Sequence, residues 1–167
     1  MYDVESIWRS MKARCYSSND PAYADCIVCR EWLNNYKMFE NWFIDNLYDC
    51  GSDKLQLDKD LFSNGDKIYS PETCCLLPGR INALISYKRN RRYPFPTGVN
   101  MASNGKYVAT VRSGSGHITG TFQTVSDAAE FYAKNKERYI KRLAVAYECY
   151  LPGKIYDALM NYKCEPF

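Results

Sequence analysis

Residues 57–82, which read LDKDLFSNGDKIYSPETCCLLPGRIN, contain the most informative pattern in the first half of the chain. It begins as a strand, and Asn64-Gly65 predicts a tight turn because this pair readily adopts the positive φ angles that short turns need. A second extended segment runs from Ile68 to Cys75, and a helix-like run then reaches Asn82. The predicted order is therefore strand, turn, strand, helix.

The residues before this stretch are predicted to be helical. Apolar side chains at Val4, Ile7, Trp8 and Met11 have the spacing of one helix face, and this pattern ends near Tyr16. A second helix is predicted over residues 31–47. Its aromatic residues share one face and are expected in the core: Trp32, Tyr36, Phe39, Trp42 and Phe43.

The residues after this stretch change character. Charge, proline and aromatic residues replace the helical period at residues 88–96, which predicts two domains, 1–90 and 91–167. Turns at Ser103-Asn104-Gly105 and at 113–116 separate three strand-like segments. Ser126 is expected to cap a helix that runs to about Tyr150, followed by a short helix over 154–162. The predicted fold class is α+β: N-terminal helices with the strand–strand–helix unit, then a three-stranded antiparallel sheet packed on a long helix.

Composition limits the partners and the compartment. The net charge of the 167-residue chain is only +3, but residues 88–92 hold four cations and residues 134–142 hold five. Each cluster is either a solvated face or a site for a polyanion. No apolar stretch approaches the roughly 20 residues that span a bilayer, and the N-terminus lacks a secretory pattern. We therefore expect a cytoplasmic protein with no membrane partner, whose eight cysteines are thiols or metal ligands rather than disulfides.

The first half of the chain resembles phage HNH-type endonucleases, which are homing-endonuclease-like proteins of the ββα-metal class. The resemblance covers most of residues 4–90, and the matching segments are Leu57-Asp58-Lys59-Asp60, Gly65, Tyr69-Ser70-Pro71-Glu72, Cys74, Trp8 to Cys15 and Val28 to Trp32. It implies that Asp58 and Asn82 are catalytic ligands of Mg²⁺ or Mn²⁺. Where the family has a general-base histidine directly after the first ligand, this chain has Lys59.

The lysine changes the expected chemistry of this site. A lysine of ordinary pKa, about 10.4, is protonated at neutral pH, and the neighbouring Asp58 and Asp60 should keep it so. Lys59 is then expected to bind phosphate or to form an ion pair, and Asp60 to act as a weak base through water. In the alternative interpretation, these three residues only stabilise the hairpin.

The spacing of five cysteines resembles the structural zinc site of some members of this class. Tetrahedral Zn²⁺ needs four donors, and the preferred set is Cys15, Cys29 and Cys75 with either Cys26 or Cys74. The alternative is that they are small buried residues.

Residues 97–150 resemble the three-stranded DNA-binding domain of plant APETALA and ethylene-response factors, which also occurs as a tail on phage HNH endonucleases. The matching segments are Gly98-Val99, Tyr107 to Arg112, Gly120 to Thr124, and Asp127-Ala128-Ala129 with Tyr132. The resemblance implies a sheet that lies in the major groove of duplex DNA, with Asn100 and Ile118 at contact positions.

Strand alternation predicts which side chains of this sheet face outward. Tyr107, Ala109 and Val111 should pack on the helix, so the other face carries Lys106, Val108, Thr110 and Arg112. His117, the only histidine of the chain, is expected to be an ordinary surface residue. The basic segment before the sheet is expected to contact phosphates through Lys88, Arg89, Arg91 and Arg92.

These features favour a phage-type DNA-binding protein of the HNH homing-endonuclease class, with metal-dependent nicking or cleavage impaired by the missing base. One alternative is a catalytically inactive DNA- or protein-binding regulator or inhibitor of host machinery on the same scaffold. Another is a module whose aromatic-rich surface serves protein contacts. Double-stranded DNA is the expected partner, with a host protein as the alternative.

Overall fold

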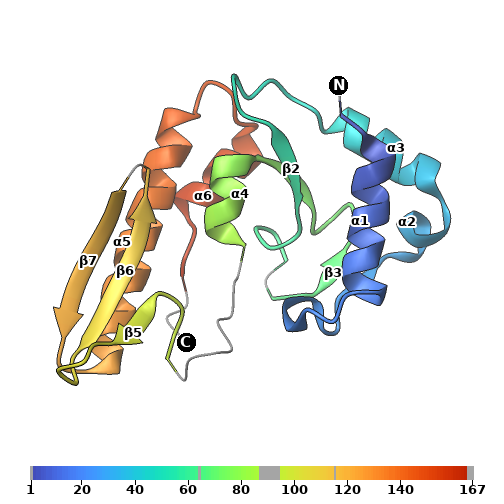
Figure 1. Ribbon diagram of the computed structural model, residues 1–167. Coiled ribbons are helices and arrows are strands. Elements are labelled where there is room, and N and C mark those ends of the chain that lie inside the picture. Colours follow the sequence, from blue (N-terminus) through green and yellow to red (C-terminus); the bar gives the residue numbers. More distant parts are fainter. Residues whose placement is uncertain (1, 64, 87–94, 115, 165–167) are drawn as a thin grey trace. The chain divides into compact units, whose positions relative to one another are not determined.

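The computed structural model describes residues 2–63, 65–86, 95–114 and 116–164, and it confirms the predicted α+β class (Figure 1). The chain divides into two compact units: Met1–Tyr87 with Tyr147–Ala158, and Lys88–Ala146 with Leu159–Phe167. The sequence predicted two contiguous domains, 1–90 and 91–167. Residues 147–158 instead group with the first unit.

Helices make up the N-terminal part of the first unit: α1 (Val4–Tyr16), the short η1 (Pro21–Tyr23), α2 (Arg30–Asn34) and α3 (Tyr36–Asp45). The single helix predicted over residues 31–47 is therefore interrupted. Asn35 has an extended backbone (φ −136°, ψ 97°), and its side chain accepts hydrogen bonds from the backbone N–H groups of Lys37 and Met38. Asparagine satisfies these otherwise unpaired donors well, so Asn35 starts a new helix instead of continuing the old one.

The core of the first unit is aromatic, as predicted. Trp32, Phe39 and Phe43 are fully buried together with Met11 of α1. Trp42 is partly buried and stacks near Trp32, with ring centroids 4.7 Å apart. These contacts hold α1, α2 and α3 together.

Two small sheets complete the first unit. β1 (Ile27–Val28) pairs in parallel with β3 (Ile68–Tyr69), and β2 (Leu55–Asp58) pairs antiparallel with β4 (Cys75–Pro78). Helix α4 (Gly79–Ile85) follows β4 directly and carries Asn82. The strand–strand–helix order is thus present in β2, β4 and α4.

The second strand of this unit lies later than predicted. The sequence placed it at residues 68–75, but residues 70–74 form a turn, in which the Cys74 N–H donates to the Ser70 carbonyl at 2.9 Å. Thr73 Oγ1 fixes the turn by donating to the Ile68 carbonyl at 2.7 Å. These hydrogen bonds hold the residues after β3 in a turn, so they cannot pair with β2. The strand that pairs with β2 therefore begins at Cys75.

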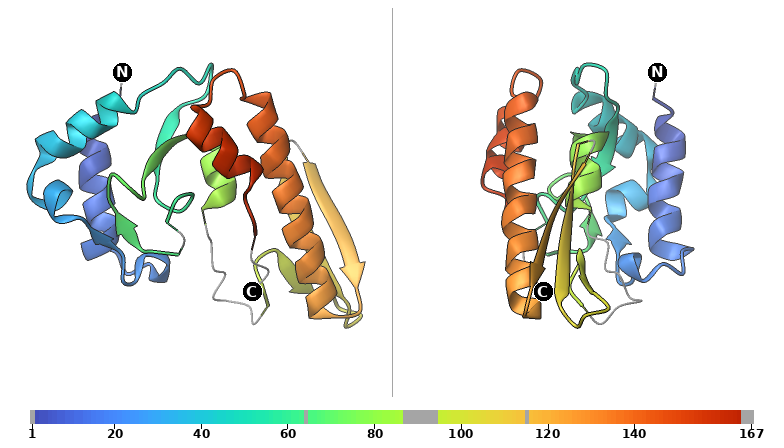
Figure 2. Two further views of the ribbon diagram at one scale, coloured as in Figure 1. Left: turned by 180° about the vertical axis from the view of Figure 1, so that it is seen from behind. Right: turned by 60° about the vertical axis from the view of Figure 1, so that its left-hand side comes forward.

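The second unit contains the predicted antiparallel sheet and long helix. The strands are β5 (Val99–Met101), β6 (Tyr107–Ser113) and β7 (Gly116–Phe122), in the order β5-β6-β7. Helix α5 (Val125–Ala146) lies along one face of this sheet in both views of Figure 2. Val99 and Ala109 of the sheet pack with Ala128 and Ala129 of α5 to form the core.

Both ends of α5 differ from the sequence prediction. Thr124 Oγ1 accepts from the Asp127 N–H at 3.1 Å and donates to the Asp127 carboxylate at 2.7 Å, so Thr124 rather than Ser126 caps the helix. The helix ends at Ala146 instead of near Tyr150, because the Tyr150 N–H turns back to the Tyr147 carbonyl at 2.9 Å. The last helix is α6 (Gly153–Met160). No helix in the described ranges is both long and apolar enough to cross a membrane.

Candidate functional site

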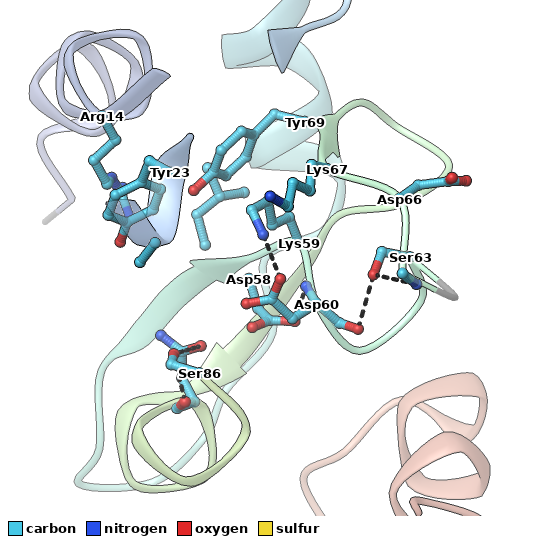
Figure 3. A pocket seen from close by; sticks show the side chains of 14 residues that line it. Arg14, Tyr23, Asp58, Lys59, Asp60, Ser63, Asp66, Lys67, Tyr69 and Ser86 are labelled. Atoms are coloured by element: carbon cyan, nitrogen blue, oxygen red, sulfur yellow. Dashed lines mark hydrogen bonds and ion pairs between the residues drawn. The ribbon is translucent and has the colours of Figure 1, made fainter. Parts of the chain in front are cut away.

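The first unit contains a cavity of about 260 Å³ beside the end of β2 (Figure 3). Its walls come from segments far apart in the sequence: the last turn of α1, η1, the end of β2 with the loop that follows it, β3 and α4. All four residues predicted to be catalytic line this one cavity: Asp58, Lys59, Asp60 and Asn82.

Asp58 is the most buried carboxylate of the cavity. It is the last residue of β2 and only 3% exposed. Its Oδ2 accepts from the backbone N–H groups of Asp60 at 2.9 Å and Leu61 at 2.8 Å, which fixes the turn after the strand. Burial raises the pKa of Asp58 to about 6, although these backbone bonds oppose the shift. At neutral pH Asp58 is therefore a desolvated anion, which favours a cation beside it.

Lys59 is a cation in this structure. It is 8% exposed, its ammonium donates to the Asp60 carboxylate, and it lies 5.8 Å from the centre of the Tyr69 ring. Burial is the largest single influence and would lower the pKa of Lys59, but the hydrogen bond to Asp60 and the nearby negative charges together outweigh burial, and the pKa is raised. Lys59 therefore has no lone pair with which to accept a proton at neutral pH.

Asn82 lines the cavity from α4. Its Nδ2 donates to Gln56 Oε1 at 2.8 Å, and among the described residues its Oδ1 has one long contact, from Ser86 Oγ at 3.5 Å. A carboxylate and an amide oxygen are the ligands that Mg²⁺ prefers, and Mg²⁺ commonly takes one or two protein ligands with water and phosphate completing its shell. Asp58 and Asn82, which line the same cavity, supply these two kinds of oxygen ligand.

The five predicted zinc ligands are mostly buried. Cys26, Cys74 and Cys75 are 2–4% exposed, and Cys15 and Cys29 are half-buried. Burial raises the pKa of Cys74 to about 12 and that of Cys15 to about 11. In the ranges that the structure describes, no three or more His, Cys, Asp or Glu side chains are grouped to hold a metal. Zinc binding stays a prediction, which the zinc content of the purified protein tests.

The outer face of the three-stranded sheet is polar. Ala109 and Val111 of β6 are buried toward α5, so the alternating residues Thr110 and Arg112 lie on the other face. Strand register adds their neighbours on that face: Asn100 opposite Val108, Thr119 opposite Thr110, Thr121 opposite Val108, and His117 opposite Arg112. Among these, Asn100, Arg112, His117, Thr119 and Thr121 are exposed, as is Lys106 just before β6.

One predicted contact position is wrong, and two positions were missed. Ile118 lies opposite Val111 and shares its helix-facing side, so it does not belong to the outer face. Thr119 and Thr121 lie on the outer face instead. Pairing the residues of the two strands outward from the turn at 113–116 would have predicted this register. The predicted phosphate contacts Lys88, Arg89, Arg91 and Arg92 lie outside the described residues.

Sequence reasoning also missed two cations of the cavity, Arg14 and Lys67. The signal for Arg14 was its spacing on α1: it lies three residues after the fully buried Met11, which puts it next to the inner face of the helix. Lys67 has no comparable signal, because its position depends on the pairing of β3 with β1.

Comparison of the chain with protein-family models, curated proteins and solved structures found no match. The functional argument therefore depends on the residues and geometry of the two sites.

Proposed function

We propose that the protein binds duplex DNA and hydrolyses its phosphodiester bonds slowly, with Mg²⁺ or Mn²⁺, as a phage-type member of the HNH homing-endonuclease class. The observation that carries the proposal is that Asp58, at the end of β2, and Asn82, on the helix that follows β4, line one cavity, to which cations also contribute. The same proposal assigns the protein to the cytoplasm, that of the host cell if it is phage-encoded.

Asp58 and Asn82 would hold the metal ion through their side-chain oxygens. When bound, such an ion neutralises charge on the phosphate and on the leaving oxygen. Asp58 contributes a full negative charge only when it is ionised, and burial raises the pKa of Asp58 to about 6, so the site suits a cation best above that pH. The two backbone N–H groups on its Oδ2 hold the carboxylate in place, and among the described residues none donates to its Oδ1.

The slow rate follows from the residues around the attacking water. Lys59 is protonated and cannot act as the base. Asp60 is the remaining candidate, and its carboxylate is held by Lys59. A carboxylate is a weaker base than imidazole, and the ammonium beside it weakens its basicity further. We therefore expect catalysis well below that of an enzyme with histidine at position 59.

DNA binding is proposed for the outer face of the sheet in the second unit. A two- or three-stranded ribbon fits the major groove of B-DNA, where exposed side chains reach base edges and phosphates. Arg112 and Lys106 supply charge, while Asn100 and Thr110 supply hydrogen-bonding groups. The basic residues 88–92 would add phosphate contacts by their charge.

A second candidate function is DNA or protein binding without cleavage, as a regulator or inhibitor of host machinery. The specific observation in its favour is the ion pair between Lys59 and Asp60. Lys59 stands at the general-base position and Asp60 is the nearest alternative base, so the ion pair engages both residues. In this case the cavity would bind DNA phosphates and leave them intact.

A plasmid-nicking assay with a series of divalent metals tests the proposal. Wild-type protein should convert supercoiled plasmid to nicked circles with Mg²⁺ or Mn²⁺ and not with a chelator, and Asp58→Ala should remove this activity. Asp66→Ala is the matched control, because Asp66 lines the same cavity but is exposed, and it should retain activity. Duplex binding with steep salt dependence but no nicking in any metal would support the regulator instead.

A further inference from the structure

We infer that Arg14 is the phosphate-binding residue of the cavity in the first unit, where its guanidinium holds a non-bridging oxygen of a DNA phosphodiester. The inference deepens the proposed function, since it names the group that recognises the substrate beside Asp58. It depends on three observations: the place of Arg14, the charges around it and the restriction of its side chain.

Arg14 reaches the cavity from the last turn of α1. Figure 3 shows its side chain beside Tyr23, with Asp58 and Lys59 on other walls of the same cavity. α1 is anchored by the fully buried Met11, so the backbone that carries Arg14 is fixed by the core. The guanidinium therefore lies on a rigid element in the same cavity as Asp58 and Asn82, the proposed metal ligands.

The side chain of Arg14 is already ordered. Its Nε donates to the Ser10 carbonyl at 3.2 Å, and its guanidinium carbon lies 5.8 Å from the centre of the Tyr23 ring and 5.9 Å from that of Tyr69. Arginine stacks readily on aromatic rings, and a restricted side chain loses less entropy when it binds a ligand. The guanidinium is also hydrogen-bonded to the Tyr23 side chain. Its other N–H groups can form the paired hydrogen bonds that match a phosphate.

The charges of the cavity single out Arg14 among its cations. Lys59 is paired with Asp60. Lys67 donates to the Ala24 carbonyl at 2.9 Å and lies 3.7 Å from the Asp25 carboxylate. For Arg14, no carboxylate of the described residues lies within ion-pair distance. Arg14 is therefore the lining cation in this part of the chain whose charge is not already matched.

The anions of the cavity explain why such a cation is needed. Asp58, Asp60 and Asp66 all line it, and together they would repel a phosphodiester. A metal ion at Asp58 and Asn82 offsets part of this repulsion, and Arg14 offsets more from the α1 side. If Arg14 only stabilised the fold by packing near the two tyrosine rings, replacing it would affect folding. It would not change the number of DNA phosphates that the protein neutralises.

The test is duplex binding by the full chain without divalent metal, measured as a function of salt. Arg14→Gln should weaken binding about 10-fold and lower the slope of log K against log salt by about 0.9, the value for one phosphate contact. Arg14→Lys keeps the charge and should keep the slope, while losing part of the affinity with the paired geometry. The matched control is Arg9→Gln, because Arg9 lies on the same helix, is exposed and is paired with Glu5.

The outcomes separate this inference from the proposed nuclease function. If the wild type nicks no plasmid but Arg14→Gln still lowers the salt slope and Arg9→Gln does not, the nuclease proposal fails and Arg14 remains a phosphate-binding residue. If Arg14→Gln is as well folded as wild type by circular dichroism and binds with unchanged slope and affinity, the inference about Arg14 is overturned. If Arg14→Gln does not fold, Arg14→Lys decides: a wild-type slope with reduced affinity supports the inference, and an affinity equal to that of the wild type overturns it. A wild type that binds no duplex overturns both.

Discussion

Asp58 and Cys75 lie directly opposite each other at the last register position of the β2–β4 pair, and both are almost completely buried. The carboxylate therefore lies at the end of a strand, largely shielded from bulk solvent, where it lines the cavity of the first unit. Two backbone N–H groups hold its Oδ2, yet burial still raises the pKa of Asp58 to about 6. Such an anion costs stability in the free protein and is suited to a cation.

The first prediction concerns the stability cost of Asp58. Its folded-state pKa of about 6 lies above the ordinary value of about 3.9 expected in the unfolded chain. The unfolded state therefore loses its proton first, and the stability contributed by Asp58 is present below about pH 4 and lost as pH rises through about 6. Asp58→Asn keeps an oxygen for both N–H groups without the charge. It should raise the free energy of unfolding by on the order of 2 kcal/mol above pH 6 and change it little near pH 4.

Tryptophan fluorescence during urea unfolding measures this effect, because Trp8, Trp32 and Trp42 all lie in the first unit. Asp66→Asn is the control for loss of an exposed carboxylate from the same cavity. A stability difference between Asp58→Asn and wild type that is the same at every pH would contradict the prediction. Asp58→Asn should also lose metal-dependent nicking, so that one substitution stabilises the fold and removes the activity.

The second prediction concerns position 59. Replacing Lys59 by histidine supplies an imidazole where the proposed mechanism lacks one, and general-base catalysis contributes about 10² to 10⁴ in rate. We expect Lys59→His to nick plasmid at least about 10²-fold faster than wild type above pH 7, where imidazole of pKa about 6.5 is largely neutral even beside a carboxylate. Nicking rates with Mg²⁺ and Mn²⁺ provide the measurement.

Lys59→Gln is the matched control, because it removes the ammonium without adding a base. If Lys59→His and Lys59→Gln nick at the same rate while Asp58→Ala is inactive, the water is not activated from position 59. Asp60→Asn then becomes the informative variant, since Asp60 is the other acceptor beside Lys59.

The third prediction concerns the sheet of the second unit. It distinguishes side chains that contact phosphates through their charge from side chains that recognise the base sequence. The double variant Lys106→Ala and Arg112→Ala should weaken all duplexes alike and lower the salt slope by about 1 for each phosphate that the protein no longer neutralises. Asn100→Ala and Thr110→Ala should reduce discrimination between sequences and leave that slope unchanged. Titrations of several duplexes over a range of salt measure both effects.

Lys134→Ala is the control for the sheet variants, because Lys134 is an exposed cation of α5 in the same unit, paired with Glu130. Unchanged duplex affinity in the double variant would remove the outer face of the sheet from the proposed interface.

The fourth prediction concerns a close approach in the second unit. Gly98 has φ +78°, and a Cβ there would lie 2.1 Å from Cε2 of the Tyr132 ring. Gly98→Ala should cost about 2 to 4 kcal/mol, from the left-handed backbone and from the displaced ring. Gly105 has nearly the same φ, +76°, but open space around it, so Gly105→Ala should cost only the backbone contribution of about 1 to 2 kcal/mol. Amide hydrogen exchange of β6 measures the loss of stability in both variants. An equal loss in Gly98→Ala and Gly105→Ala would show that the Tyr132 ring moves aside without cost.

Local patterns predicted much of the fold. The alternation along β6 placed Ala109 and Val111 toward the helix, because a strand turns successive side chains to opposite faces. The aromatic face that contains Trp32 and Phe39 was predicted to be core because helical spacing gathers these large side chains on one side. In both cases the signal is contained within a single element.

The errors arose where side-chain hydrogen bonds compete with the regular period. Asn35 interrupts a continuous aromatic pattern because its carboxamide caps α3, and Thr73 closes a turn where extended residues were expected. The spacing of Arg14 after Met11 indicates the inner side of α1, but the cavity around it could not be predicted, because its neighbours Tyr23 and Tyr69 lie 9 and 55 residues away in the sequence and meet it only through the fold. Such contacts leave no local period to detect.

The parallel pairing of β1 with β3, only two residues long, ties the middle of the loop between β2 and β4 to the N-terminal helices. The Ile27 N–H donates to the Lys67 carbonyl and the Cys29 N–H to the Tyr69 carbonyl, each at 2.9 Å, while the Tyr16 hydroxyl accepts from the Val28 N–H at 3.0 Å. A minimal fragment that kept only the hairpin and α4 would retain Asp58 and Asn82 but lose the wall that bears Arg14. The N-terminal helices are thus an integral part of the cavity, and truncating or loosening α1 should first weaken the phosphate binding proposed for Arg14.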